Sequence, residues 1–484
     1  MNRIINCTRV RRNECLIVVL LPETKIFFNL SASADLKSKI MKHSIGKRNT
    51  MLSVSALGVA LLLTAASVNY NKSADEGIVR CATPKANKPC IMKTIFGLEN
   101  TEPEISATVV TPNSIVEASL KKGLEWIKEA QGNDGGWGAG THARQDIKDP
   151  HAVPSDPATT ALVGMALLRN GTTLKNGDFS TQLKKANEFL MEAVEHCPDN
   201  QPYITTLTNT QPQTKLGRNI DVILTAQYFT NLLRYEIGDA QLKKRIEQSL
   251  DKCVARIQKG QDADGSWKDG GWAPVLQSAL ANNALETAKG IGRKVDNEVL
   301  DRSRKYQNSN FDVQTNSALT GKSAGVMLYS LSSTTRASAE DAKKAKDIIQ
   351  KANQDGMLQE VVVTANNLRR AGISAPRAQE LETAYKINEA SRKQALKDEV
   401  MTGYGNNGGE EFISYLMTGE SMIMQDGNDW KKWYDKMEST LLKIQNNDGS
   451  WNGHHCITSP VFCTATCLLI LSINKDMQFS MHLK

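Results

Sequence analysis

Two short segments near the C-terminal end of the chain carry residue types that can bind a metal ion or move protons. Gly408-Gly-Glu410-Glu411-Phe412 offers two adjacent carboxylates, and His454-His455-Cys456 offers imidazoles and a thiol. Oxygen, nitrogen and sulfur ligands of these kinds are the ones that zinc accepts. The candidate catalytic residues are Glu410, Glu411, His454 and His455. The candidate zinc ligands are Glu411, Cys463 and His455, with Glu410, His454 and Cys456 as alternatives, and the candidate ligand contacts are Tyr404, Phe412 and Phe462.

The same residues also have a purely structural interpretation. Two Glu residues at the start of a helix are favoured by the helix dipole. Cys463 and Cys467 are four residues apart in an apolar segment, as expected for core residues or for disulfide partners of Cys456. The histidine pair follows a turn and is compatible with an exposed loop. The sequence therefore leaves a functional cleft and a structural role as alternatives.

Other clusters of metal-ligating residue types are weaker. The segment THARQDIKDPHAVPSDP is typical of a polar loop between helices, and its last acid, Asp156, precedes Pro157 as a helix N-cap would. Its candidate ligands are His142, Asp146, Asp149, His151 and Asp156. Asp251-Lys-Cys253 lies within an amphipathic segment that predicts a helix, which favours a structural role.

A repeated turn shows how these segments are positioned. The pattern Gln-x-x-Asp-Gly-(Gly or Ser)-Trp occurs three times, and each copy follows an amphipathic stretch of helical period. The Asp-Gly step predicts a helix end, because glycine tolerates the left-handed conformation there. An apolar segment rich in small residues follows each turn. The repeat residues are Gln131, Asp134, Trp137, Gln261, Asp264, Trp267, Gln445, Asp448 and Trp451.

The repeats predict an all-α chain of about seven helix pairs between residues 114 and 475. The charged helices would be outer helices and the small-residue helices would be inner ones, which can pack closely around a common axis. We expect outer helices near 114–131, 180–196, 241–261, 294–307, 338–353, 377–400 and 429–445. We expect inner helices near 156–169, 219–235, 273–289, 314–332, 357–371, 410–424 and 460–473.

The three turns resemble the QW repeats of the prenyltransferase and squalene-cyclase superfamily, whose members are α/α toroids. The resemblance covers roughly residues 114–475 and implies a closed ring with a central cavity. It also implies that the Gln and Trp residues tie neighbouring outer helices together.

The acidic string that starts cyclisation in triterpene cyclases is missing from the chain, as is the DDxxD pattern of terpene synthases. Aromatic residues make up only 6%, too few to line a cavity that stabilises carbocations. The thioester string of the complement toroids, Cys-Gly-Glu-Gln, is also missing. Cyclase chemistry and thioester capture are therefore not expected.

The protein prenyltransferases hold zinc through Asp, Cys and His residues of two successive inner helices. The segment from Phe462 to Leu469 resembles the helix that carries the zinc histidine, but Cys463 stands in its place. Glu410 and Glu411 open the preceding inner helix, where the family has its Asp and Cys. The resemblance thus suggests the location of a zinc site while every ligand type differs.

Composition limits the classes of function. The chain has 484 residues, 40% hydrophobic and 23% charged residues, as in globular proteins, which excludes a multi-span transporter. The net charge is 59 − 52 = +7. The first fifty residues carry ten basic and three acidic residues, so residues 51–484 hold 49 of each sign. With no net basic charge on the folded body, we do not expect nucleic-acid binding.

The N-terminal region predicts export. Residues 1–50 form a basic tail, and 51–70 read as a signal peptide or a membrane anchor because Leu52–Val68 is apolar and follows Lys47 and Arg48. Translation starting at Met41 or Met51 is a further hypothesis. Residues 71–113 form a linker, in which Cys81 and Cys90 can close a disulfide outside the cytoplasm, and 476–484 form a tail.

Two functions remain after these exclusions. The first is an exported or membrane-tethered toroid that binds a protein, a peptide or a hydrophobic ligand in its central cavity. The second is a metal-dependent enzyme, prenyltransferase-like or hydrolytic, with its site at the last two inner helices and zinc as the one cofactor considered.

Overall fold

A computed structural model of the chain describes residues 5–11, 14–21, 24–31, 92–100, 114–269, 271–403, 408–424 and 428–476. The chain divides into two compact units, Met1–Ile78 and Val79–Lys484. The predicted signal or anchor at 51–70, the linker cysteines Cys81 and Cys90, and Tyr404 lie outside the described residues.

The first unit contains an antiparallel three-stranded sheet within the predicted basic tail. The strands are β1 (Ile5–Arg11), β2 (Glu14–Leu21) and β3 (Thr24–Ser31), in the order β1-β2-β3. Cys7 is paired with Ile17, and Ile17 with Phe28. Within the described part of the chain, no helix combines the length and the apolar character needed to cross a membrane.

The second unit is built from helices that alternate between two kinds. The helices of one kind contain the small-residue segments or follow them, and these helices are almost entirely buried. They are α4 (Pro157–Arg169), α7 (Ile220–Leu232), α9 (Pro274–Gly290), the first half of α11 (Met327–Gln354), α15 (Gly409–Ile423) and α17 (Pro460–Leu471). We call these the inner helices. The amphipathic outer helices are α3 (Ser114–Glu129), α5 (Ser180–Glu195), α8 (Ala240–Lys259), α10 (Asn297–Asn308), α13 (Ala375–Ala395) and α16 (Asn428–Ile444). The predicted all-α character of this unit is confirmed.

Short elements connect the long helices. They are η1 (His142–Arg144), η2 (Pro150–Ala152), α6 (Gln211–Leu216), α12 (Ala365–Arg370), α14 (Asp398–Met401) and η3 (Ile473–Lys475), with the hairpins β4 (Met92–Lys93) with β5 (Glu99–Asn100) and β6 (Phe311–Asp312) with β7 (Ser317–Ala318).

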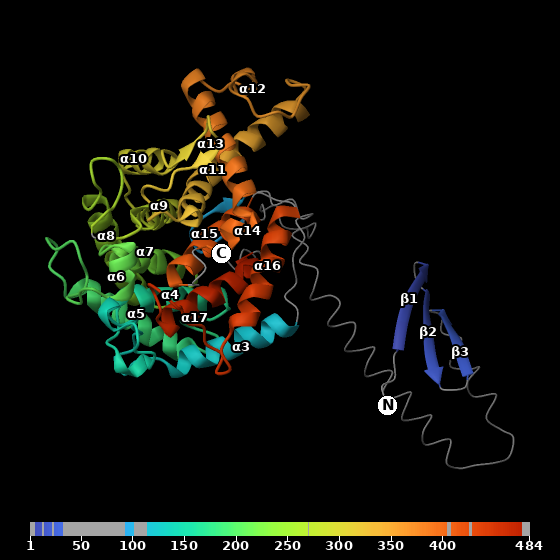
Figure 1. Ribbon diagram of the computed structural model, residues 1–484, viewed down its shortest axis with the longest axis horizontal. Coiled ribbons are helices and arrows are strands. Elements are labelled where there is room, and N and C mark those ends of the chain that lie inside the picture. Colours follow the sequence, from blue (N-terminus) through green and yellow to red (C-terminus); the bar gives the residue numbers. More distant parts are fainter. Residues whose placement is uncertain are drawn as a thin grey trace, which may run out of the picture. The chain divides into compact units, whose positions relative to one another are not determined.

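Each inner helix packs against the inner helices before and after it in the chain. α4 contacts α7, α7 contacts α9, α9 contacts α11, α11 contacts α15, and α15 contacts α17. The last of them, α17, also packs against the first, α4, and Figure 1 shows these segments from opposite ends of the unit together. The succession of contacts therefore returns to its starting point.

The three repeat turns make the same hydrogen bonds. Each Trp indole donates to the carbonyl ten residues before it in its own outer helix, at 2.7–2.8 Å. Each Gln amide donates within its own turn and also to a carbonyl of another outer helix: Gln131 to Gln182 in α5, Gln261 to Val299 in α10, and Gln445 to Ser119 in α3. The third of these bonds joins the last outer helix to the first.

The fourth predicted inner helix and the fifth predicted helix pair have a different structure. The predicted inner helix 314–332 and outer helix 338–353 are instead a hairpin followed by one continuous helix, α11. Neither Gly nor Pro occurs between Met327 and Asp355 to stop this helix, and Gly356, with φ +75°, ends it. Where inner helix 357–371 was predicted, the structure has only the short helix α12. Six pairs are therefore found in the described residues, against about seven expected.

The second half of α11 forms a small core of its own. Ala345 and Ile349 of α11 pack with Leu368 of α12 and Leu381 of α13 in an apolar cluster distinct from the main one. Figure 1 shows α11 and α13 running side by side to α12, away from α3 and α17. The second half of α11, helix α12 and the segment between them thus contain nearly all of the residues that were predicted as the fifth helix pair, 338–353 and 357–371.

Candidate functional site

The start of α15 and the loop 452–459 hold the acidic, imidazole and thiol groups together. The Gly409 amide donates to the carbonyl of Ile457 at 2.9 Å, and the Ile457 amide donates to Glu410 Oε2 at 3.1 Å. A Cβ at Gly408 would lie 2.6 Å from the carbonyl oxygen of His455, so only glycine allows this approach. Gly408 and Gly409 thus allow this loop to pack closely on the start of α15.

Glu410, His455 and Cys456 converge on one point. One ligand atom from each lies within 4.8 Å of the other two, and this is the one such group found in the described parts of the chain. His455 Nδ1 and Cys456 Sγ are 2.6 Å apart. Cys456 has φ +63°, a left-handed conformation that costs a residue with a side chain on the order of 1 kcal/mol. In this conformation the Cys456 thiol lies beside the Glu410 carboxylate.

Burial disfavours the charged forms of two members of the cluster. It raises the pKa of Glu410, although a hydrogen bond from Cys456 and the Ile457 amide act in the opposite direction. Burial and the Glu410 carboxylate raise the pKa of Cys456 to about 12. Without a bound cation Cys456 is therefore a neutral thiol at pH 7, and a divalent metal ion would favour its thiolate.

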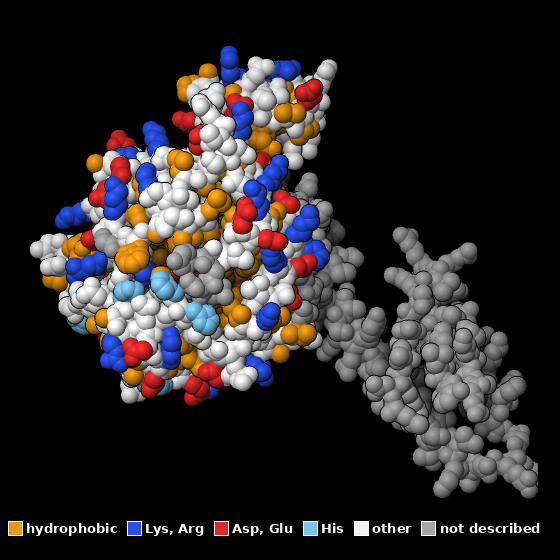
Figure 2. Space-filling view, in the orientation of Figure 1, with side chains coloured by type: hydrophobic (Ala, Val, Ile, Leu, Met, Phe, Trp, Pro, Cys, Tyr) orange, Lys and Arg blue, Asp and Glu red, His pale blue; other side chains and the backbone are white. Residues whose placement is uncertain are grey.

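A lysine and a histidine lie next to the cluster. Lys215 of α6 is 3% exposed, and its Nζ lies 3.4 Å from the ring centroid of Trp272. Burial, followed by the charges of Lys215 and His455, lowers the pKa of His142, whose ring lies 6.4 Å from that of Trp272. Figure 2 shows several histidine side chains close together on the side of the molecule in view, beside apolar side chains.

Gln211 anchors the loop that carries His455 and Cys456. Its Oε1 accepts hydrogen bonds from the amides of Thr458 at 2.7 Å and Ser459 at 2.9 Å. The sequence patterns did not indicate Gln211, Lys215 or Trp272. Each comes from a loop or short helix far from Glu410 in the chain, and no spacing pattern links them to it.

The structure separates the residues that were predicted as zinc ligands. Glu411 is buried on another side of α15, where its carboxyl group lies near Tyr415 and the backbone of Gly403. Cys463 is 0% exposed, and its thiol donates to the carbonyl of Ile457 at 3.5 Å. Of the predicted set, only His455 belongs to the converging group, and Glu410 and Cys456 take the other two places.

The remaining candidates have structural surroundings. His454 is exposed outside the converging group, and Phe412 and Phe462 are buried in the core. Asp156 caps α4 as predicted, Asp149 caps η2, and Asp146 pairs with Arg144, while His151 is exposed. Cys253 is fully buried, and Asp251 forms an ion pair with Arg293. Five described cysteines, including Cys456, Cys463 and Cys467, are free thiols.

Comparison of the chain with known protein families, with curated proteins and with solved structures found no match to any of them.

Proposed function

We propose that residues 114–475 form a closed α/α toroid of the prenyltransferase and squalene-cyclase type, exported or tethered by the N-terminal segment, with a zinc ion at one mouth. The unbroken succession of inner-helix contacts and the Gln445 bond to α3 support closure. The convergence of Glu410, His455 and Cys456 within 4.8 Å carries the metal proposal.

The donor set fits zinc in number and kind. A carboxylate, an imidazole and a thiol are all ligands that zinc takes, and three protein ligands leave a fourth position for water or for a ligand. Cys456 and Glu410 also lie where burial makes their charged forms unfavourable. A divalent cation bound between them would offset that cost.

A zinc ion bound at this mouth would supply Lewis acidity and an acidified water molecule. The protein residues around it have separate tasks. Lys215 places a positive charge next to the cluster, His142 offers an imidazole whose pKa is lowered, and Trp272, 60% exposed, offers an aromatic surface. We therefore propose a hydrolytic or transfer reaction on an anionic or polarised group that enters at this mouth.

Metal analysis of the purified protein, reconstituted with zinc and freed of excess metal, tests the site. The expected content is about one zinc per chain. Glu410→Gln and Cys456→Ser should lose most of it, because each removes a ligand atom.

Glu411→Gln and Cys463→Ser are the matched controls. Both residues are buried neighbours of the same types that lie outside the converging group, so both variants should keep the metal. A zinc-free wild-type protein, or equal loss in the control variants, would leave only the toroid that binds a ligand without metal.

A further inference from the structure

A tight turn lies buried at the opposite ends of the inner helices. Strands β4 and β5 pair as a short hairpin, and residues Thr94–Leu98 connect them. The Thr94 amide donates to the Leu98 carbonyl at 2.9 Å, and the Leu98 amide donates to Thr94 Oγ1 at 3.1 Å. Thr94 and Phe96 are both 0% exposed. The helices therefore enclose the turn as they would a bound ligand, although the turn belongs to the same chain and precedes the first outer helix.

The inner helices hold this turn through its main chain. Arg234 donates to the carbonyl of Thr94 at 2.9 Å, and Arg336 of α11 donates to that of Phe96 at 2.7 Å. Two amides of α7, Gln227 and Asn231, donate to the carbonyl of Ile95 at 2.8 and 2.9 Å. Three consecutive carbonyl groups are thus recognised by side chains.

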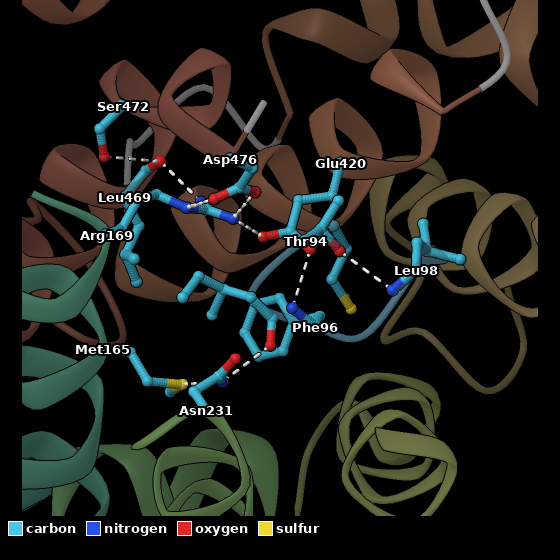
Figure 3. A network of polar contacts seen from close by, with 12 residues as sticks. Thr94, Phe96, Leu98, Met165, Arg169, Asn231, Glu420, Leu469, Ser472 and Asp476 are labelled. Atoms are coloured by element: carbon cyan, nitrogen blue, oxygen red, sulfur yellow. Dashed lines mark hydrogen bonds and ion pairs between the residues drawn. The ribbon is translucent and has the colours of Figure 1, made fainter. Parts of the chain in front are cut away.

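The Phe96 amide of the turn donates a hydrogen bond to a helix, and the acceptor, Glu420, belongs to a buried ion network. The Phe96 amide donates to Glu420 Oε2 of α15 at 2.9 Å, and the other oxygen of Glu420 pairs with Arg169 of α4. Arg169 also donates to Asp476 at 2.6 and 2.9 Å (Figure 3). Because Glu420 and Arg169 are fully buried, an unpartnered oxygen here would carry a desolvation penalty.

Two side-chain positions of the turn add selectivity. Gly97 has φ +81°, and a Cβ at this residue would lie 2.0 Å from Thr287 Oγ1 in α9. The Phe96 ring packs in the main apolar core. The surroundings therefore accept a turn with an aromatic residue followed by glycine.

We propose that this end of the inner helices is a peptide-binding site and that Thr94–Leu98 is its intramolecular ligand. The site reads a turn conformation through main-chain hydrogen bonds, with selectivity for Phe96 and Gly97. It is separate from the zinc mouth: Glu410 and Glu420 are ten residues apart on α15, about 15 Å along the helix axis. A cut in the linker that follows the turn leaves the preceding chain bound to the helices.

Cleavage of the full-length protein tests this site. A specific protease site is inserted between residues 101 and 113, the protein is cut, and the products are separated by native size-exclusion chromatography. The N-terminal fragment should co-elute with the helical unit. An excess of a synthetic peptide spanning Met92–Asn100 should displace it.

Peptide variants keep the test independent of the folding of mutant proteins. A peptide with Gly97→Ala should compete at least about tenfold more weakly, because the added methyl group meets Thr287 and the residue keeps a left-handed φ. A peptide with Phe96→Ala should also be weaker. Immediate separation of the fragment after cleavage, or equal competition by wild-type and Gly97→Ala peptides, would overturn the proposal. Neither result depends on zinc.

Discussion

At the residue scale, two buried carboxylates start neighbouring inner helices. Asp156 caps α4 and accepts from the amides of Thr159 and Ala139, and Asp221 in the first turn of α7 accepts from the amide of Ala158 and from Gln213. Both are 1% exposed. Burial raises the pKa of Asp156 to about 6, and burial together with the charge of Asp156 raises the pKa of Asp221 to about 7. Both pKa values thus exceed those of an unfolded chain.

These shifts predict a pH dependence of stability. Between pH 4 and 7 the folded protein holds protons that the unfolded chain has released, so the stabilising contribution is complete below about pH 4 and is lost as the pH rises through 6 to 7. Asp221→Asn, which resembles the protonated acid, should reduce the loss of unfolding free energy between pH 5 and 8 by on the order of 2 kcal/mol. Urea unfolding at both pH values measures it.

The control for this prediction is Asp178→Asn, a change at an exposed acid. It should leave the pH dependence as in the wild type. Identical dependence in Asp221→Asn and wild-type protein would show that the buried pair does not hold these protons.

At the element scale, the repeat turns depend on glycine for two reasons. Gly135, Gly265 and Gly449 have φ values of +86°, +88° and +96°. Each also approaches the backbone of another outer helix: a Cβ at Gly265 would lie 2.3 Å from the carbonyl oxygen of Arg302 in α10. The same glycine therefore ends one outer helix and contacts another outer helix.

Gly265 and Gly292 form a matched pair that distinguishes the cost of the left-handed backbone conformation from the cost of the close contact. Gly292 has φ +85°, but a Cβ at this residue would meet nothing within 4 Å, so Gly292→Ala should cost only the conformational strain, about 1 kcal/mol. Gly265→Ala adds a backbone clash and should cost at least about 2 kcal/mol more. Denaturant unfolding of both variants measures the difference. Equal costs would mean that the helices at this turn are not in close contact.

The repeats explain which elements could be predicted from the sequence. Where a turn carries the Gln, Asp-Gly and Trp residues, as at Gln131 and Gln445, the predicted helices agree with the structure within a few residues. Between Met327 and Asp355 no such turn exists, and the period alone suggested a boundary that the chain does not make. Local stop signals, not the spacing of repeats, determine where these helices end.

At the scale of the whole second unit, the two proposed sites lie at opposite ends of the inner helices. Glu410, Lys215 and His455 meet at one end, and Thr94–Leu98 is held at the other. For the first end the sequence indicated Glu411 and Cys463 with His455, whereas the structure groups Glu410 and Cys456 with His455. Adjacent residues of a helix differ in direction by about 100°, which separates Glu411 from Glu410, and Cys456 lies in a loop whose course the repeats do not predict. The sequence did not indicate the second end, because most contacts of Thr94–Leu98 with the helices go to main-chain carbonyl groups, which every residue has.

X-ray absorption at the zinc edge of the reconstituted protein identifies the atoms that bind the metal. A site formed by Glu410, His455 and Cys456 should give one sulfur neighbour at about 2.3 Å and nitrogen or oxygen neighbours at about 2.0–2.2 Å. The sulfur signal should vanish in Cys456→Ser and persist in Cys463→Ser. A protein that takes up no zinc, or a spectrum whose sulfur signal survives Cys456→Ser, would contradict the assignment of Glu410, His455 and Cys456 as the metal site.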